Sequence, residues 1–235
     1  LSLARNANNN GQPMMSIKEL EVNANGSLVY GLFDGVDLRS ESLVDRFTTT
    51  VEQINLSFSH QFSDTFEVTG LIGRSKSELE NLERLTVNLD AVDTDNYSID
   101  FRNGGNIPIL SYGIDVANPN NFQYAAGLSD GTVLGNWNIG SSSRTTENTT
   151  AGVNFGWQAT DAFKIKFGAQ HRVSDYKVRT QQLAPAYTAT RNLPAGVSVS
   201  AFTRIVKGVN DKLGSNTLGN YVGVDHEKWK QAVGF

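Results

Sequence analysis

Two stretches of the sequence alternate strictly between apolar and polar residues. Residues 149–173 contain two alternating segments, one before and one after the short connection at residues 159–162. Alternation over this length is typical of a β-strand with one apolar and one polar face. Thr160 and Asp161 in the joining segment have side chains that bond to nearby backbone and interrupt a strand. The stretch therefore predicts a β-hairpin that closes through a tight turn.

Residues 55–73 repeat the same unit earlier in the chain. Phe58 corresponds to Phe155 and Asp64 to Asp161, and both pairs are 97 positions apart (155 − 58 and 161 − 64). A supersecondary unit that recurs at a constant offset indicates an internal repeat. The sequence therefore predicts two similar hairpins with a long insertion between them.

The pattern divides the chain into five segments. Residues 45–75 and 149–180 are the two predicted hairpins, whereas 1–44, 76–148 and 181–235 are expected to be long loops. The turns at one end of the strands take about four residues, and the connections at the other end take about 50 to 75, far more than ordinary loops. Short turns at one end and long loops at the other are typical of outer-membrane β-barrels.

Some local structure is expected within the long loops. Leu79 and Leu82 lie three positions apart in residues 78–84, which predicts one or two helical turns. The serine-rich residues 140–146 read as a flexible lead-in to the second hairpin. Short strands are predicted at residues 27–33, 96–102 and 107–116.

A short helix is expected near the end of the last loop. Good helix formers follow Asp225, whose side chain can cap the first turn. Gly234 stands where a helix commonly ends in a left-handed residue.

The apolar faces of the two hairpins have two interpretations. In an outer-membrane barrel this face meets lipid and the polar face lines the lumen; in a soluble β-sandwich it meets a second sheet. Alternation alone does not separate the two. Aromatic residues gather beside both turns, as in a girdle at a membrane interface; they are Phe58, Phe62, Phe66, Phe155, Trp157 and Phe163. This clustering favours lipid, and the sandwich stays open as the alternative.

Composition narrows the function classes. The chain of 235 residues has a net charge of −4, which argues against a nucleic-acid-binding protein. It has no cysteine, which excludes disulfides, thiolate zinc sites and thiol catalysis. The sequence starts at Leu1 with neither an initiator methionine nor a signal peptide, so we expect it to be an internal piece of a longer polypeptide.

An ordered set of short motifs carries a resemblance to a known family. The motifs are NANGSLVYG at 23–31, VDLRSE at 36–41, HQFSD at 60–64, GLIGRS at 70–75, YSIDFR at 97–102 and SYGIDVANP at 111–119. In this order they are similar to the barrel region of TonB-dependent outer-membrane receptors, particularly the alphaproteobacterial group. The similarity runs over most of the chain.

The resemblance implies a fold, a function and partners. The fold would be all-β, with antiparallel hairpins of an incomplete outer-membrane barrel and long extracellular loops; whole barrels of the family have about 22 strands. The function would be capture of a bulky nutrient, such as a siderophore, cobalamin or an oligosaccharide, and its passage into the periplasm. Partners would be outer-membrane lipid, that ligand, and a plug domain and the TonB system, which other parts of the polypeptide would contact. No nucleic-acid partner is expected. The alternative is a secreted or surface β-rich protein that assembles through strand edges.

Enzymatic chemistry has little support. Gly127 to Gly131 match the G-x-S-x-G pattern around Ser129, but the sequence lacks the helix that must follow a nucleophile elbow. The histidines His60, His171 and His226 stand apart, and zinc needs three or four convergent ligands. We therefore expect no enzyme, no cofactor and no metal; an oxygen cluster of Asp93, Asp95 and Asp100 fits a solvated loop better than calcium.

The candidate site residues form two groups. Polar positions of the hairpins would line the lumen: Asn55, Ser57, Glu67, Asn154, Gln158, Lys164, Lys166, Gln170 and Arg172. Lys164 and Lys166 would pair with plug carboxylates, meet an anionic solute or balance charge in a hydrated wall. Aromatic residues of the long loops would stack on a ligand or pack the loops together: Tyr112, Phe122, Tyr124 and Trp137.

Overall fold

The computed structural model divides the chain into two compact units. The strand unit comprises residues 45–84 and 140–182, and the core unit comprises residues 1–44, 85–139 and 183–235. The structure describes residues 2–4, 15–124, 137–183, 193–207 and 219–235.

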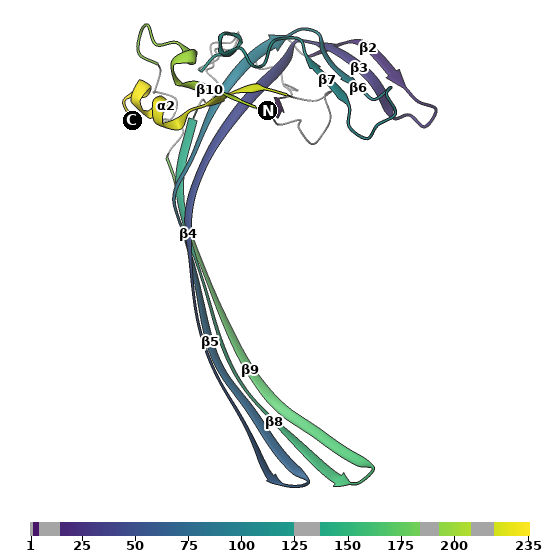
Figure 1. Ribbon diagram of the computed structural model, residues 1–235, viewed down its shortest axis with the longest axis vertical. Helices are drawn as coiled ribbons and strands as arrows, with labels where there is room; N and C mark the ends of the chain where they lie inside the picture. Colours follow the sequence, from purple (N-terminus) through teal and green to yellow (C-terminus); the bar gives the residue numbers. More distant parts are fainter. Residues whose placement is uncertain (1, 5–14, 125–136, 184–192, 208–218) are drawn as a thin grey trace. The chain divides into compact units, whose positions relative to one another are not determined.

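Four long strands build the strand unit. They are β4 (Val36–Ser63), β5 (Phe66–Thr94), β8 (Trp137–Thr160) and β9 (Phe163–Gln182), and they lie in this order in one sheet (Figure 1). The antiparallel register of β8 and β9 is unbroken from the pair Gly140 and Gln182 to the pair Gln158 and Lys164. Residues 64–65 and 161–162 form the two turns. The predicted all-β class and both predicted hairpins are confirmed.

The strands are much longer than the sequence pattern predicts. Residues 78–84, predicted to form helical turns, lie within β5, so that prediction is wrong. Arg46 on β4 pairs with Glu83 at 3.2 Å, and the Asn81 amide donates to the Asp45 carboxylate. Residues 140–146 are not a flexible lead-in but part of β8, paired with β9. Pairing with neighbouring strands overrides the local preference of these residues.

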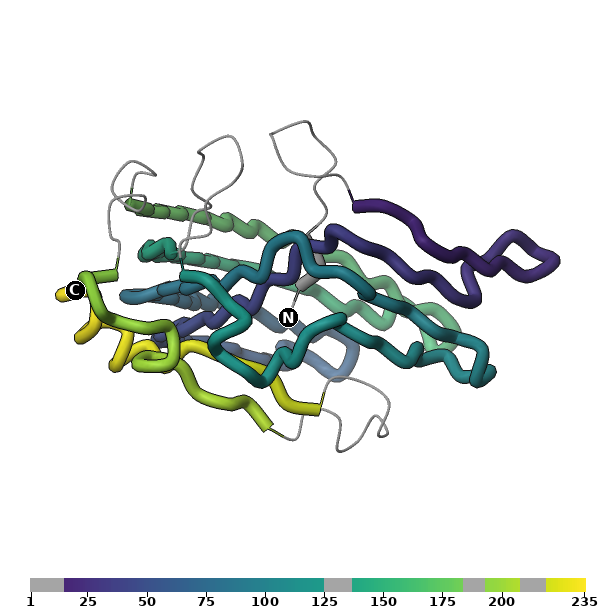
Figure 2. Tube along the Cα trace, turned by 90° about the horizontal axis from the view of Figure 1, so that it is seen from above, coloured from purple at the N-terminus to yellow at the C-terminus, as the bar shows by residue number. Residues whose placement is uncertain are grey.

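The core unit holds most of the remaining secondary structure. Its four-stranded sheet has the order β2 (Ser16–Val22), β3 (Leu28–Asp34), β6 (Tyr97–Asp100) and β7 (Ile109–Tyr112), with antiparallel neighbours. Figure 2 shows the β2–β3 and β6–β7 segments side by side. The short strands predicted near 27–33, 96–102 and 107–116 are thus confirmed as β3, β6 and β7.

Short elements complete the core unit. β1 (Ser2–Ala4) pairs with β4, and β10 (Thr203–Val206) pairs with β11 (Tyr221–Val224). The 3₁₀ helices are η1 (Pro119–Asn121) and η2 (Val199–Phe202). Large parts of the segments predicted as loops are therefore ordered elements.

The predicted terminal helix is confirmed as α2 (His226–Val233). The Asp225 carboxylate accepts a hydrogen bond from the Lys228 backbone N–H, and Gly234 ends the helix with a positive φ of 64°. Trp229 on this helix is fully buried. No helix among the described residues has the length and apolar content that crossing a membrane requires.

A hydrophobic core holds the core unit together. Alternate residues of β4 and β5 enter it, together with aromatic residues from β6, β8, η2, α2 and the segment after η1. Its buried members are Val36, Leu38, Leu85, Val87, Leu89, Ala91, Tyr97, Val116, Phe122, Tyr124, Trp137, Phe202, Val222, Val224 and Trp229. Because several of these residues come from segments without regular alternation, the sequence pattern did not predict this core.

Candidate functional site

One face of the strand unit is apolar and exposed. On β9, Phe163, Phe167 and Val173 lie on this face, and the register places Phe155 of β8 opposite Phe167. The Phe167 side chain is 56% exposed. A contiguous apolar surface of this kind marks a site that meets a partner or a membrane. We call this face over residues 54–62, 66–72, 149–157 and 163–173 the apolar belt.

Aromatic rings link the four strands of the belt. Phe155 stacks on Phe167 with ring centroids 4.9 Å apart, and Phe66 of β5 stacks on Phe155 at 6.3 Å. Phe62 of β4 lies 5.9 Å from Phe66. The rings therefore form a row across all four strands, so the aromatic residues predicted beside the turns share one face.

The belt ends at a level of charged residues. The Arg74 guanidinium on β5 lies 3.0 Å from the Glu147 carboxylate on β8. The register of the sheet places Glu147 opposite Asp175 of β9. A hollow of about 440 Å³ at the same level is lined by Glu52, Arg74 and Lys76, together with Gln53 and Ile54. The change from apolar to charged thus occurs at one level across neighbouring strands.

The height of the belt follows from the strand geometry. Residues 163–173 of β9 span ten steps of about 3.3 Å, or roughly 33 Å along the strand. A strand tilted by about 40° converts this length into a height of about 25 Å. Outer-membrane barrels have an apolar band of about that height.

The opposite face carries the predicted lumen-facing residues. The register pairs Lys164 with Gln158, Gly168 with Asn154, and Arg172 with Thr150, so these side chains share one face with Lys166 and Gln170. On β4 and β5, Asn55, Ser57 and Glu67 occupy the positions that alternate with the belt. The structure therefore brings these nine residues to one face, as predicted; whether that face lines a lumen stays a prediction.

Two glycines shape this polar face. A Cβ atom on Gly156 would lie 2.6 Å from Glu67 Oε1, and one on Gly168 would collide with Asn154 Oδ1. The absence of a side chain at Gly156 lets Glu67 cross β8, and its Oε1 reaches Lys164 Nζ at 2.9 Å. A hollow of about 510 Å³ opens beside these residues, and its lining includes Thr69, Lys166 and both glycines.

The predicted loop contacts lie in the core unit. Phe122, Tyr124 and Trp137 are each only 3% exposed. Tyr124 packs edge-on against Phe202 at 5.6 Å, and Trp137 lies 5.6 Å from Trp229. A ligand outside the molecule cannot reach these three rings in this arrangement, so the packing alternative describes them.

Tyr112 is the fourth predicted loop contact. It is half-buried, and its ring lies 6.0 Å from that of Tyr97 on the neighbouring strand. Burial raises the pKa of Tyr112 to about 12, so its hydroxyl stays protonated at neutral pH. Its role as a ligand contact stays a prediction.

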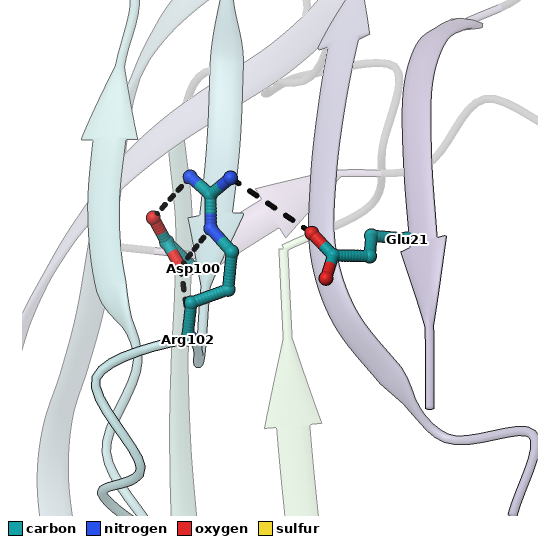
Figure 3. Close-up of polar contacts among 3 residues, drawn as sticks. All are labelled: Glu21, Asp100 and Arg102. Atoms are coloured by element: carbon teal, nitrogen blue, oxygen red, sulfur yellow. Dashed lines mark hydrogen bonds and ion pairs between the residues drawn. The ribbon is translucent and has the colours of Figure 1, made fainter. Parts of the chain in front are cut away.

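A charged cluster that the sequence pattern did not reveal links β2 to the end of β6 in the core unit (Figure 3). Arg102 donates to both Asp100 carboxylate oxygens, at 2.9 and 2.7 Å, and lies 3.9 Å from Glu21. Its guanidinium carbon is 4.0 Å from the centre of the Tyr30 ring. The hydrogen bonds from Arg102 hold the pKa of Asp100 below its usual range. Two of the five guanidinium N–H groups of Arg102 donate to Asp100, and the ion pair with Glu21 links Arg102 to a second strand.

The remaining chemical candidates lie apart. The His60 ring packs against the Phe62 ring at 4.4 Å, and the strand register places His171 opposite Ala151. Nε2 of His226 lies 3.0 Å from the Ser42 carbonyl oxygen. Over the described ranges, no group of three or more metal-ligating side chains converges on one point. Ser129 lies outside the described residues.

No family model and no curated protein matches the sequence. The function of the chain is therefore inferred from the geometry of the strand unit and from its resemblance to outer-membrane receptors.

Proposed function

We propose that the strand unit is part of the barrel wall of a TonB-dependent receptor in the bacterial outer membrane. The receptor would bind a bulky nutrient, such as a siderophore, cobalamin or an oligosaccharide, and pass it into the periplasm. The single observation that carries the proposal is the apolar belt, with its row of aromatic rings and its charged end. The plug domain and the TonB system would be contacted by other parts of the polypeptide.

The exposure of the belt supports lipid as its partner. In a soluble sandwich this face would lie against a second sheet, yet Ile54, Leu56 and Phe167 are all exposed. The charged residues Arg74 and Glu147 follow the apolar residues on the same face. The apolar part of this face is about 25 Å high, and charged residues follow it. This is the pattern of a barrel wall whose charged residues lie where the hydrocarbon core of the bilayer ends.

The free strand edges support a larger sheet. Among the strands that the structure describes, β9 is the last in the sheet order, and β1 covers β4 only at Asp37, Leu38 and Arg39. In lipid every backbone N–H and C=O group needs a partner, so both edges require further strands. A larger barrel would supply those strands.

Substitution on the belt tests the proposal. Phe167 lies near the middle of the belt, so Phe167→Arg should place a charge near the bilayer midplane at a cost of about 2–4 kcal/mol. We expect much less of the variant to assemble in the outer-membrane fraction. Gln170→Arg, on the polar face of the same strand, is the matched control and should assemble normally. Normal assembly of Phe167→Arg would rule out lipid exposure.

The free edges also fit a second function. A secreted or surface β-rich protein could assemble through the edges of β4 and β9, because unpaired strand edges are templates for pairing. Under that alternative the protein would stay in solution without detergent. Recovery of the protein from a soluble or secreted fraction would favour this second function.

A further inference from the structure

We propose that the polar face of the strand unit binds a solute carrying carboxylate or phosphate groups, in the hollow beside Lys166. The inference rests on the proposed function, because it names the class of solute that this face would meet. The evidence is the charge balance of the face and the shape of the hollow.

The polar face has an excess of positive charge over the height of the belt. Four charged side chains of the described strands lie there: Glu67, Lys164, Lys166 and Arg172. The Glu67 carboxylate lies 2.9 Å from the Lys164 ammonium, which neutralises both groups. Within the described part of the chain, no ion pair involves Lys166 or Arg172. The face therefore carries a net charge of +2 from these four side chains, and such a surface concentrates anions.

The hollow beside Lys166 has suitable size and chemistry. It measures about 510 Å³, and Gly156 and Gly168 form part of its wall without side chains. Lys166, Thr69 and Asn154 line it and offer an ammonium, a hydroxyl and an amide as hydrogen-bond donors. Hydrogen bonds from charged donors to carboxylate or phosphate oxygens are stronger than those between neutral groups.

The direction of Glu67 keeps the hollow available to an anion. Because Gly156 has no Cβ, the Glu67 side chain crosses above it and its carboxylate meets Lys164. Among the described residues that line the hollow, the one carboxylate bonds Lys164 and acts on Lys166 only through the weaker attraction of their charges. Of the nutrients named above, an acidic chelate or an acidic oligosaccharide matches this wall better than a neutral solute.

Calorimetric titration of the whole chain in detergent with citrate, a compact trianion, tests the inference. We expect citrate to bind at low salt and to bind more weakly as ionic strength rises, because salt screens the attraction. Lys166→Gln should weaken binding roughly fivefold to tenfold, whereas Lys166→Arg keeps the charge and should bind nearly as well as the wild type.

Lys177→Gln is the matched control. Lys177 lies on the same strand, pairs with Thr145, and belongs to the opposite face beyond the belt. The Lys177→Gln substitution removes one positive charge, as Lys166→Gln does, and should leave citrate binding unchanged. Absence of citrate binding, binding that ignores salt, or equal weakening by Lys166→Gln and Lys177→Gln would each overturn the inference. Assembly of the protein in the outer membrane would be unaffected by that result, so the proposed function is tested separately.

Discussion

Single residues decide how neighbouring strands contact one another on the polar face. Gly156 is the clearest case, because its missing side chain leaves the space through which Glu67 reaches Lys164. Gly152 lies on the same face of the same strand, but a Cβ atom there would meet other atoms only at 3.6 Å or more. The two glycines therefore differ in what a larger side chain would displace.

Gly156→Val should destabilise the strand unit by about 1 kcal/mol. The new side chain displaces Glu67, which loses its contact with Lys164 and packs less well. The measurement is a guanidinium titration in detergent micelles, with tryptophan fluorescence as the signal. Gly152→Val should be neutral or slightly stabilising, since valine favours strands and has room there. Equal destabilisation by both substitutions would contradict the role assigned to Gly156.

The Arg102 cluster predicts a pH dependence of stability. Hydrogen bonds from Arg102 lower the pKa of Asp100 in the folded protein. A group with a lowered folded pKa stabilises the protein above its unfolded pKa of about 3.9, and this contribution is lost as pH falls through the folded value. Arg102→Gln should therefore lower the unfolding temperature at pH 7, and its difference from the wild type should shrink below about pH 4.

A second arginine serves as the control for this measurement. Arg204 on β10 is exposed, and no ion pair to it occurs among the described residues. Arg204→Gln should change the unfolding temperature little at any pH. A gap between wild type and Arg102→Gln that stays constant from pH 7 to pH 3 would contradict the assignment to Asp100.

Residue roles differ in how far the sequence reveals them. Lys164 and Glu67 were placed on one face correctly, because strand alternation assigns faces without knowledge of the neighbours. The ion pair between the partly exposed Arg39 and the buried Asp90, joined at 2.6 Å, was not predicted. These two residues are 51 positions apart, and nothing in the local pattern indicates that they meet.

Among the elements, the hairpins were predictable and the full strands were not. Each hairpin is local, so alternation and turn chemistry specify it within about 25 residues. Residues 85–91 of β5 also alternate between apolar and polar, and Leu85, Val87 and Leu89 enter the core, so this part of the strand has a local signal. Residues 78–84 have no such alternation: their leucine spacing resembles a helix, but pairing within the sheet determines their conformation.

The long loops were the largest difference from the sequence-based expectation. Phe122, Tyr124 and Trp137 come from polar, irregular segments, yet all three are buried in the core unit. Such a core forms from contacts between distant segments, and a single sequence carries no periodic signal for them. Only elements with their own local signal, such as β3, β6, β7 and α2, were predicted there.

At the scale of the whole molecule, the two units bury apolar residues in different ways. The core unit buries six of its aromatic side chains, including Trp229, although Phe235 is exposed. In the strand unit, Phe62 and Phe167 of the aromatic row are exposed. Exposed aromatic residues on one face fit the membrane partner proposed for the strand unit.

The three tryptophans of the chain allow this contrast to be tested directly. Trp157 is 47% exposed on the belt near the turns, whereas Trp137 and Trp229 are buried in the core unit. In vesicles of brominated lipid, bromine quenches only tryptophans that touch acyl chains. We expect quenching in the wild type, and stronger quenching by bromine near the head group than near the end of the chain, because Trp157 lies close to one end of the belt. Trp157→Phe should lose nearly all of the quenching. Equal quenching of wild type and Trp157→Phe would mean that lipid contacts the core unit instead, and no quenching of either would mean that protein covers the belt.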